Sequence, residues 1–201
     1  LKGLVLLIRK SNGFSDIQLA LEIIEQLKFE QKDFEDKYIG DIELPKQRQA
    51  AMSLVGIYHV SKALTDAASY LKAGYSHSHR RITSTIRQHI DIALSLQDKN
   101  SRITDFIILI GANLQLLVKN SIWTDTNFQD KIKQLCQFKA NSGVLELLPS
   151  QRRALQGNML DVAANSIVLQ MPTSAGKTLM AEFNILVTRS LRSDSKIVYI
   201  V

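Results

Sequence analysis

The chain has 201 residues, a formal net charge of +6 at neutral pH, and 45% hydrophobic residues. This length can bury a sizeable core in one large domain or two small ones, and the modest basic charge permits nucleic-acid binding without requiring it. The single cysteine, Cys136, excludes an intrachain disulfide and favours a reducing setting. We therefore expect a cytoplasmic protein in which Cys136 is a small apolar core residue.

The longest apolar stretch, residues 106–118, is interrupted by Asn113 and Gln115. It is too short to cross a bilayer, which takes about 20 residues. No secretory signal is visible from Leu1 onward. The sequence therefore predicts a buried helix here and no membrane partner.

Residues 15–138 carry helix signals in series and almost no strand signals. Ser15 and Asp16 suit the start of one helix. Pro45 suits the first turn of a long second helix, and Gly74 suits its end. These positions predict two helices in the first 74 residues.

Apolar residues at helical spacing predict a third helix around residues 82–94 and a fourth over residues 106–118, capped by Asn100 or Ser101. No repeat or low-complexity tract interrupts them.

A shorter helix is expected over residues 128–138, capped by Thr126 or Asn127. The polar stretch 139–143 then ends in glycine, which suits a domain boundary. We therefore expect a compact helical accessory domain of four or five helices over residues 1–143.

The most informative motif is the run Met-Pro-Thr-Ser-Ala-Gly-Lys-Thr at residues 171–178. An apolar, β-branched run, residues 166–170, precedes it, and residues 179–187 have the pattern of a helix with an apolar face. Strand, glycine-containing loop and helix follow each other in a phosphate-binding loop. The motif therefore predicts a nucleoside triphosphate site.

Each residue type of the loop suits this chemistry. Gly176 lets the backbone approach the phosphates, Lys177 brings a charge to the β and γ oxygens, and Thr178 offers a hydroxyl to Mg²⁺. The general pattern has glycine where this chain has Met171. The alternative is a Gly-Lys-Thr tripeptide that falls by chance at a helix start. The expected ATP-binding residues of the loop are Thr173, Ser174, Ala175, Gly176, Lys177 and Thr178.

A second strand-like run, residues 196–201, follows the expected helix. Residues 144–201 then have the order that opens a parallel α/β domain. Such a domain must continue, and hydrolysis needs a further acidic residue on a later strand. We therefore interpret the chain as part of a longer protein and expect that this part alone does not hydrolyse ATP.

The run Leu-Pro-Ser-Gln at residues 148–151, the loop from Met171 and the strand-like run ending at Val201 resemble the first motor domain of superfamily 2 helicases of the DEAD/DEAH type. The sequence Pro-Thr-Ser-Ala-Gly-Lys-Thr is most similar to the loop of the branch that includes exosome-associated RNA helicases and archaeal DNA-repair helicases. The resemblance covers residues 147–201. It implies an α-helical N-terminal domain followed by the start of an α/β RecA-like domain with an incomplete parallel sheet.

The resemblance also implies a role for Gln151, which follows Pro149 on a helix ahead of the loop. In these helicases such a glutamine binds the N6 and N7 edge of adenine, and a planar amide offers the matching donor and acceptor. The alternative is an exposed helix glutamine. Phe138 is the nearest candidate for an aromatic ring that stacks on adenine.

By resemblance, the intact protein is an ATP hydrolase that uses ATP and Mg²⁺ to unwind or move along DNA or RNA. Two alternatives stay open. The protein could be a P-loop ATPase that remodels a protein partner, or its helical domain could be a docking or regulatory module on an inactive motor.

One further cluster combines histidines with arginines. Metal binding needs convergent ligands, and a His-x-His pair supplies at most two, so a solvated loop and helix start is expected rather than a zinc site. A contact to a nucleic-acid backbone is the alternative. The cluster comprises His77, His79, His89, Arg80, Arg81 and Arg87. We expect Trp123 and Phe128 to pack inside the helical domain.

Overall fold

The computed structural model describes most of the chain and divides it into two compact units. The described residues are 1–36, 44–74, 79–97, 101–124, 126, 130–161, 163, 166–172, 174–192, 194 and 196–198. The first unit is Leu1–Lys119 and the second is Asn120–Val201. The division precedes the helix that contains Phe138, whereas the boundary expected from the sequence follows that helix.

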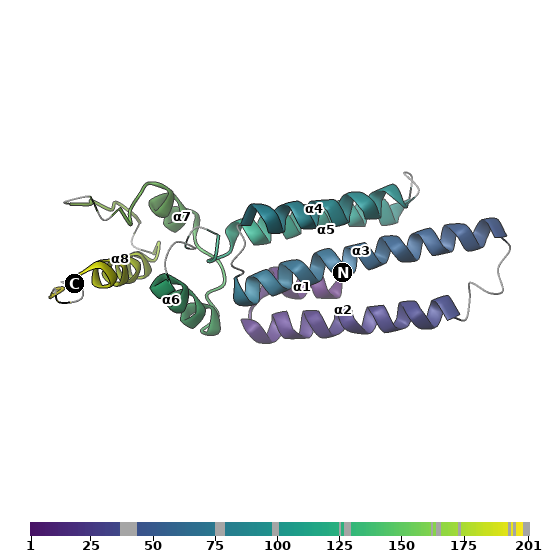
Figure 1. The fold of residues 1–201 in the computed structure, drawn as a ribbon, viewed down its shortest axis with the longest axis horizontal. Coiled ribbons are helices and arrows are strands. Elements are labelled where there is room, and N and C mark those ends of the chain that lie inside the picture. Colours follow the sequence, from purple (N-terminus) through teal and green to yellow (C-terminus); the bar gives the residue numbers. More distant parts are fainter. Residues whose placement is uncertain are drawn as a thin grey trace. The chain divides into compact units, whose positions relative to one another are not determined.

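The first unit is a bundle of long helices, which run side by side in Figure 1. Helix α3 packs against both α2 and α4, and α1 packs against α2. The core contains residues from every helix, such as Leu7, Ile17, Leu71, Ile86 and Leu114. The bounds are α1 Lys2–Arg9, α2 Phe14–Phe34, α3 Leu44–Ala73, α4 His79–Ser95 and α5 Arg102–Asn120.

The start of α2 uses Asp16 differently from the expected cap. Gly13 is the N-cap residue, and the Asp16 carboxylate accepts hydrogen bonds from the Asn12 backbone N–H (3.0 Å) and side-chain amide (3.0 Å). The Ser11 hydroxyl adds a third bond at 3.2 Å. These bonds lower the pKa of Asp16, with the backbone bond from Asn12 as the largest cause. Asp16 thus fixes the turn between α1 and α2.

Two histidines join α3 to α4. The Nδ1 atoms of His59 and His89 lie 2.9 Å apart, so one imidazole donates its N–H and the other accepts it. On the other side of its ring, His89 Nε2 lies 3.8 Å from Asp66 Oδ2. Burial lowers the pKa of His89, and burial raises the pKa of Asp66. Burial at this contact therefore favours the neutral form of His89.

Helix α5 packs one face into the unit. Its buried residues are Ile107, Ile110, Gly111, Leu114, Leu117 and Val118. At Gly111 the helix comes so close to α4 that an added Cβ would lie 2.9 Å from Cγ2 of Ile90. A larger residue at this position would force the Ile90 side chain or the helices themselves to shift. The other face of α5 is exposed to solvent.

The second unit contains α6 Asp130–Asn141, α7 Pro149–Gln156 and α8 Lys177–Leu191. Helix α8 contacts both α6 and α7. Before α6, the buried hydroxyl of Thr126 donates to the Ile122 carbonyl and accepts a hydrogen bond from the Cys136 thiol at 3.1 Å. Cys136 is fully buried, and burial raises its pKa to about 11. The expectation that it is a core residue is confirmed.

The expected parallel sheet is wrong. The described residues contain no strand, and their one isolated bridge joins Ser121 to Glu146. Residues 166–170 and the described part of the second run, 196–198, are irregular, with Val168 94% and Val198 79% exposed. A parallel sheet is stable when helices cover both of its faces. In the described part of the chain, neither run has strand partners or cover on two sides.

The helices match the sequence prediction more closely. Helices α2, α3, α4 and α5 lie where apolar periodicity placed them, Gly74 ends α3 with φ 53°, and the Ser101 hydroxyl accepts from the Ile103 N–H at 3.2 Å. Trp123 is buried, as expected. Helix α1 was not predicted. The proposed caps Asn100 and Asn127, together with Phe128 and His77, lie outside the described residues.

Helix α5 is the one helix in the described part of the chain that is long and apolar enough to cross a membrane. It has 19 residues, a mean hydropathy of 1.3 over its most apolar window, and 33% of that window buried. The expected buried helix is therefore a helix with only one buried face.

The histidine pair makes the first unit sensitive to acid. The pKa of His89 is lower in the folded chain than its usual value of about 6.5, so the unfolded chain binds more protons below that pH. The free energy of unfolding therefore falls as the pH drops through about 6.5. We expect the unfolding midpoint to fall between about pH 7.5 and 5.5, and to fall less in His89→Gln. Thermal unfolding by circular dichroism measures both chains, and equal slopes would contradict the assignment.

Candidate nucleotide-binding site

The loop before α8 ends in a glycine that the backbone requires. Gly176 is the N-cap residue of α8 and has φ 74° and ψ 41°, a left-handed conformation that side chains disfavour. A Cβ at this position would lie 2.2 Å from Nε2 of Gln151. Two independent constraints, backbone conformation and space, therefore require glycine here.

The first turn of α8 is open to an anion. Its N-cap residue has no side chain, no side-chain hydrogen bond caps the helix, and no acidic residue lies in the first turn. The first N–H groups of a helix lack partners within the helix and carry its positive dipole end. Lys177 and Thr178 begin this turn, and both are exposed. Backbone donors, a lysine and a hydroxyl therefore meet at one helix start.

The remaining loop residues are placed as follows. Met171 and Ala175 are buried, and Ser174 is exposed. The Ala175 N–H donates to the Pro172 carbonyl at 3.1 Å, so this amide closes a turn. Thr173 lies outside the described residues.

The Gln151 side chain is buried and bonded at both ends. Its Oε1 accepts from the Leu148 N–H at 2.8 Å, and its Nε2 donates to the Gly176 carbonyl at 3.2 Å. The first bond caps the start of α7, and the second joins α7 to the loop. The alternative of an exposed glutamine is wrong, because this residue is only 5% exposed.

This arrangement bears on the adenine role of Gln151. An amide that binds adenine needs its donor and its acceptor free in one plane. Here the two bonds use one lone pair of Oε1 and one N–H of Nε2. Because the side chain is only 5% exposed, a base can reach the second lone pair and the second N–H only after neighbouring side chains move. Adenine recognition stays a prediction.

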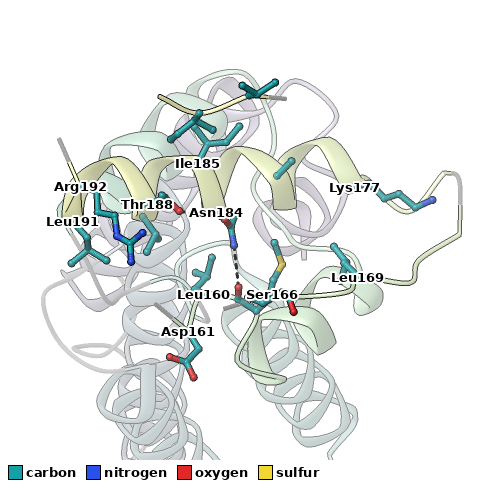
Figure 2. A pocket seen from close by; sticks show the side chains of 16 residues that line it. Leu160, Asp161, Ser166, Leu169, Lys177, Asn184, Ile185, Thr188, Leu191 and Arg192 are labelled. Carbon is teal, nitrogen blue, oxygen red and sulfur yellow. Dashed lines mark hydrogen bonds between the residues drawn. The ribbon is translucent and has the colours of Figure 1, made fainter. Parts of the chain in front are cut away.

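A cavity of about 610 Å³ lies along one face of α8. Figure 2 shows Lys177 at the loop end of this face and Asn184 near its middle. The Asn184 side-chain amide donates to the Met159 carbonyl at 3.3 Å, which holds α8 against the turn after α7. The walls combine apolar side chains such as Leu169 and Ile185 with polar ones. Cationic side chains line both ends of the cavity, Lys177 at the loop end and Arg192 at the other.

Sequence reasoning missed two contacts that position α8. The Asn184 bond is one, and a polar residue seven positions after Lys177, hence on the same helix face, was its only signal. The other is an ion pair of 2.7 Å between Lys139 of α6 and Glu182 of α8. Phe138, the candidate for stacking on adenine, lies beside Lys139 on α6 and is exposed. Its side chain is thus accessible, and its role stays a prediction.

A comparison with models of known protein families finds no match for this chain, and a comparison with solved structures finds none either.

We expect Gly176→Ala to destabilise the second unit by about 2–3 kcal/mol. Roughly 1 kcal/mol comes from the left-handed backbone, and the remainder from the two Gln151 hydrogen bonds that the new Cβ disrupts. Urea unfolding followed by the fluorescence of Trp123, the only tryptophan of the chain, reports on this unit.

Gly143→Ala is the matched control for this substitution. Gly143 also has a positive φ, 90°, but a Cβ there meets nothing within 4 Å, so only the backbone cost applies. In a Gln151→Ala background, Gly176→Ala should cost no more than Gly143→Ala. An equal cost of Gly176→Ala in both backgrounds would show that Gln151 does not brace the loop.

Proposed function

We propose that this chain carries the ATP-binding loop of an ATP-dependent nucleic-acid helicase or translocase. One observation carries the proposal: a left-handed glycine, Gly176, opens an uncapped helix whose first two residues are Lys177 and Thr178. Backbone N–H groups, a lysine charge and a hydroxyl at one helix start match the needs of a triphosphate bound with Mg²⁺.

The residues present fit ATP and Mg²⁺. Gly176 has no side chain and precedes the open first turn of α8, so no Cβ stands between a phosphate and the backbone at this position. Mg²⁺ bound with a nucleotide takes most of its ligands from phosphate oxygens and water, so one hydroxyl from the protein suffices. Lys177 would bind the β and γ oxygens, and Thr178 would bind the metal.

The proposal that the partner is a nucleic acid rests on the sequence of the loop motif and on the net positive charge of the chain. The chain has 25 basic and 19 acidic residues, which suits a polyanionic partner. Under this proposal the protein acts inside the cell and moves along DNA or RNA. Gln151, which already contacts Gly176, would select adenine through its amide once the side chain is exposed.

A second candidate is a P-loop ATPase that remodels a protein partner. Its supporting observation is that the first unit is a helical bundle with exposed apolar residues, which suits a docking module. The same nucleotide site serves both candidates.

We expect the 201-residue chain to bind ATP in the presence of Mg²⁺ and Lys177→Ala to weaken this binding at least about tenfold. Lys177 is the one cationic residue in the first turn of α8, and a charge-assisted bond to phosphate contributes about 1.5–3 kcal/mol. Isothermal titration calorimetry with ATP measures the loss. Lys196→Ala, at an exposed lysine outside the loop, should bind like the unchanged chain. Equal binding by both variants would remove Lys177 from the site.

ATP hydrolysis by the intact protein separates the two candidates. We expect single-stranded DNA or single-stranded RNA to stimulate hydrolysis, and Lys177→Ala to abolish it, because translocation couples turnover to the strand. Hydrolysis that ignores both polymers would favour the remodelling ATPase. An intact protein that binds ATP without hydrolysing it would leave a nucleotide-dependent scaffold.

A further inference from the structure

The outer face of α5 is apolar and exposed. Leu109 is 50% and Leu116 54% exposed, and Ile108 and Phe106 are exposed beside them. Ala112, also exposed, lies between the two leucines. Single exposed apolar residues are ordinary, but a contiguous row along one helix marks an interaction surface.

This row lies opposite the face that packs into the first unit. Buried Ile110, Leu114 and Leu117 point inward at helical spacing, and Gly111 lets α5 pack closely on Ile90 of α4. A helix that is apolar on both faces is stable only when both are covered. Among the described residues of the first unit, nothing covers the outer face.

The spacing along the outer face is that of a helix–helix seam. Asp105, Ala112 and Lys119 follow each other at intervals of seven residues, and Leu109 and Leu116 are also seven apart. Seven residues are close to two helical turns, so all five lie in one stripe. The small Ala112 lies at its centre and allows another helix to come close.

The charges at the two ends of the stripe identify its partner. Asp105 lies in the first turn of α5 and Lys119 in its last turn, and both are exposed. If two copies of α5 cross in opposite directions with Ala112 at the two-fold axis, residue i lies opposite residue 224 − i. Asp105 of each copy then faces Lys119 of the other, and Ile108 faces Leu116.

We propose that this protein forms a homodimer through the outer face of α5, with the two helices antiparallel about Ala112. A two-fold interface uses the same patch on both copies and must be self-complementary. The stripe meets this condition in charge and, where Ile108 faces Leu116, in apolar content, while Leu109 lies opposite Gln115. This proposal is independent of nucleotide binding at α8.

A lipid bilayer fits this face less well. The carboxylate of Asp105 lies within the same stripe, and burying an ionised carboxylate in hydrocarbon is costly. Lys119 at the far end would also leave an unmatched pair of opposite charges 14 residues apart. A second copy pairs both charges.

The contact should be reversible. Asp105 and Lys119 lie 14 positions apart, about 21 Å along the helix. One helix pair of this length buries less than the roughly 1,200–2,000 Å² of a stable interface, so we expect a dissociation constant of about 1–100 µM.

Sedimentation velocity of the 201-residue chain over a range from about 1 to 200 µM tests the proposal. Leu109→Lys should leave a monomer throughout this range, because it places a lysine of each copy in the apolar seam. Leu19→Lys is the matched control, since Leu19 is 46% exposed on α2 and lies outside the stripe. Circular dichroism checks that both variants keep the helical fold. A monomeric unchanged chain at the highest concentration would overturn the proposal.

A charge exchange tests the antiparallel register. Asp105→Lys brings two lysine pairs together in each dimer and should weaken association about tenfold. Adding Lys119→Asp restores opposite charges only if these two positions face each other, so the double variant should associate like the unchanged chain.

Asp105 and Lys119 also suit the dipole of their own helix. This effect predicts the reverse order of the single and double variants. Through the dipole alone, the double variant should be the least stable, with no recovery of the dimer. Failure of the double variant to recover would therefore overturn the register. Binding of the unchanged chain to phosphatidylcholine vesicles that is lost in Leu109→Lys would assign this face to a membrane and overturn the proposal.

Discussion

The buried amide of Gln151 ties the loop before α8 to the start of α7. Its acceptor holds the Leu148 N–H, and its donor holds the Gly176 carbonyl. Gly176 can occupy its left-handed conformation beside this amide only because it has no Cβ. The direction of the first turn of α8, and hence of Lys177, depends on this contact.

Three polar contacts therefore fix α8 within the second unit. Gln151 holds its N-terminal end, Glu182 pairs with Lys139 of α6, and Asn184 binds the Met159 carbonyl. Each contact connects α8 to a different segment. A ligand that moves the first turn of α8 would be opposed by, or transmitted through, these three contacts.

The helices could be predicted because their signals are local. The stripe at Ile86, Ile90 and Ala93 and the glycine at position 74 each act within a few residues. Helix α1 escaped prediction because it has only eight residues and starts without a capping side chain. For the site, the motif gave the glycine, the lysine and the threonine, because these act through the backbone next to them.

What failed were the features that depend on distant partners. The run around Val168 has the composition of a buried strand, but a strand gains stability only from neighbours, and in the described residues it has none. The chemistry of the Gln151 amide was predictable, whereas its partner Gly176, 25 residues away, was not. Composition thus indicated strands where pairing did not form them.

The buried thiol of Cys136 gives the chain a built-in reporter of local opening. It is the only cysteine, it bonds to Thr126 beneath α6, and its high pKa keeps it protonated. Alkylation requires an exposed thiolate, so a reagent can modify this chain only when α6 lifts away. Because Lys139 of the same helix is paired with Glu182, the alkylation rate measures how firmly α8 is held.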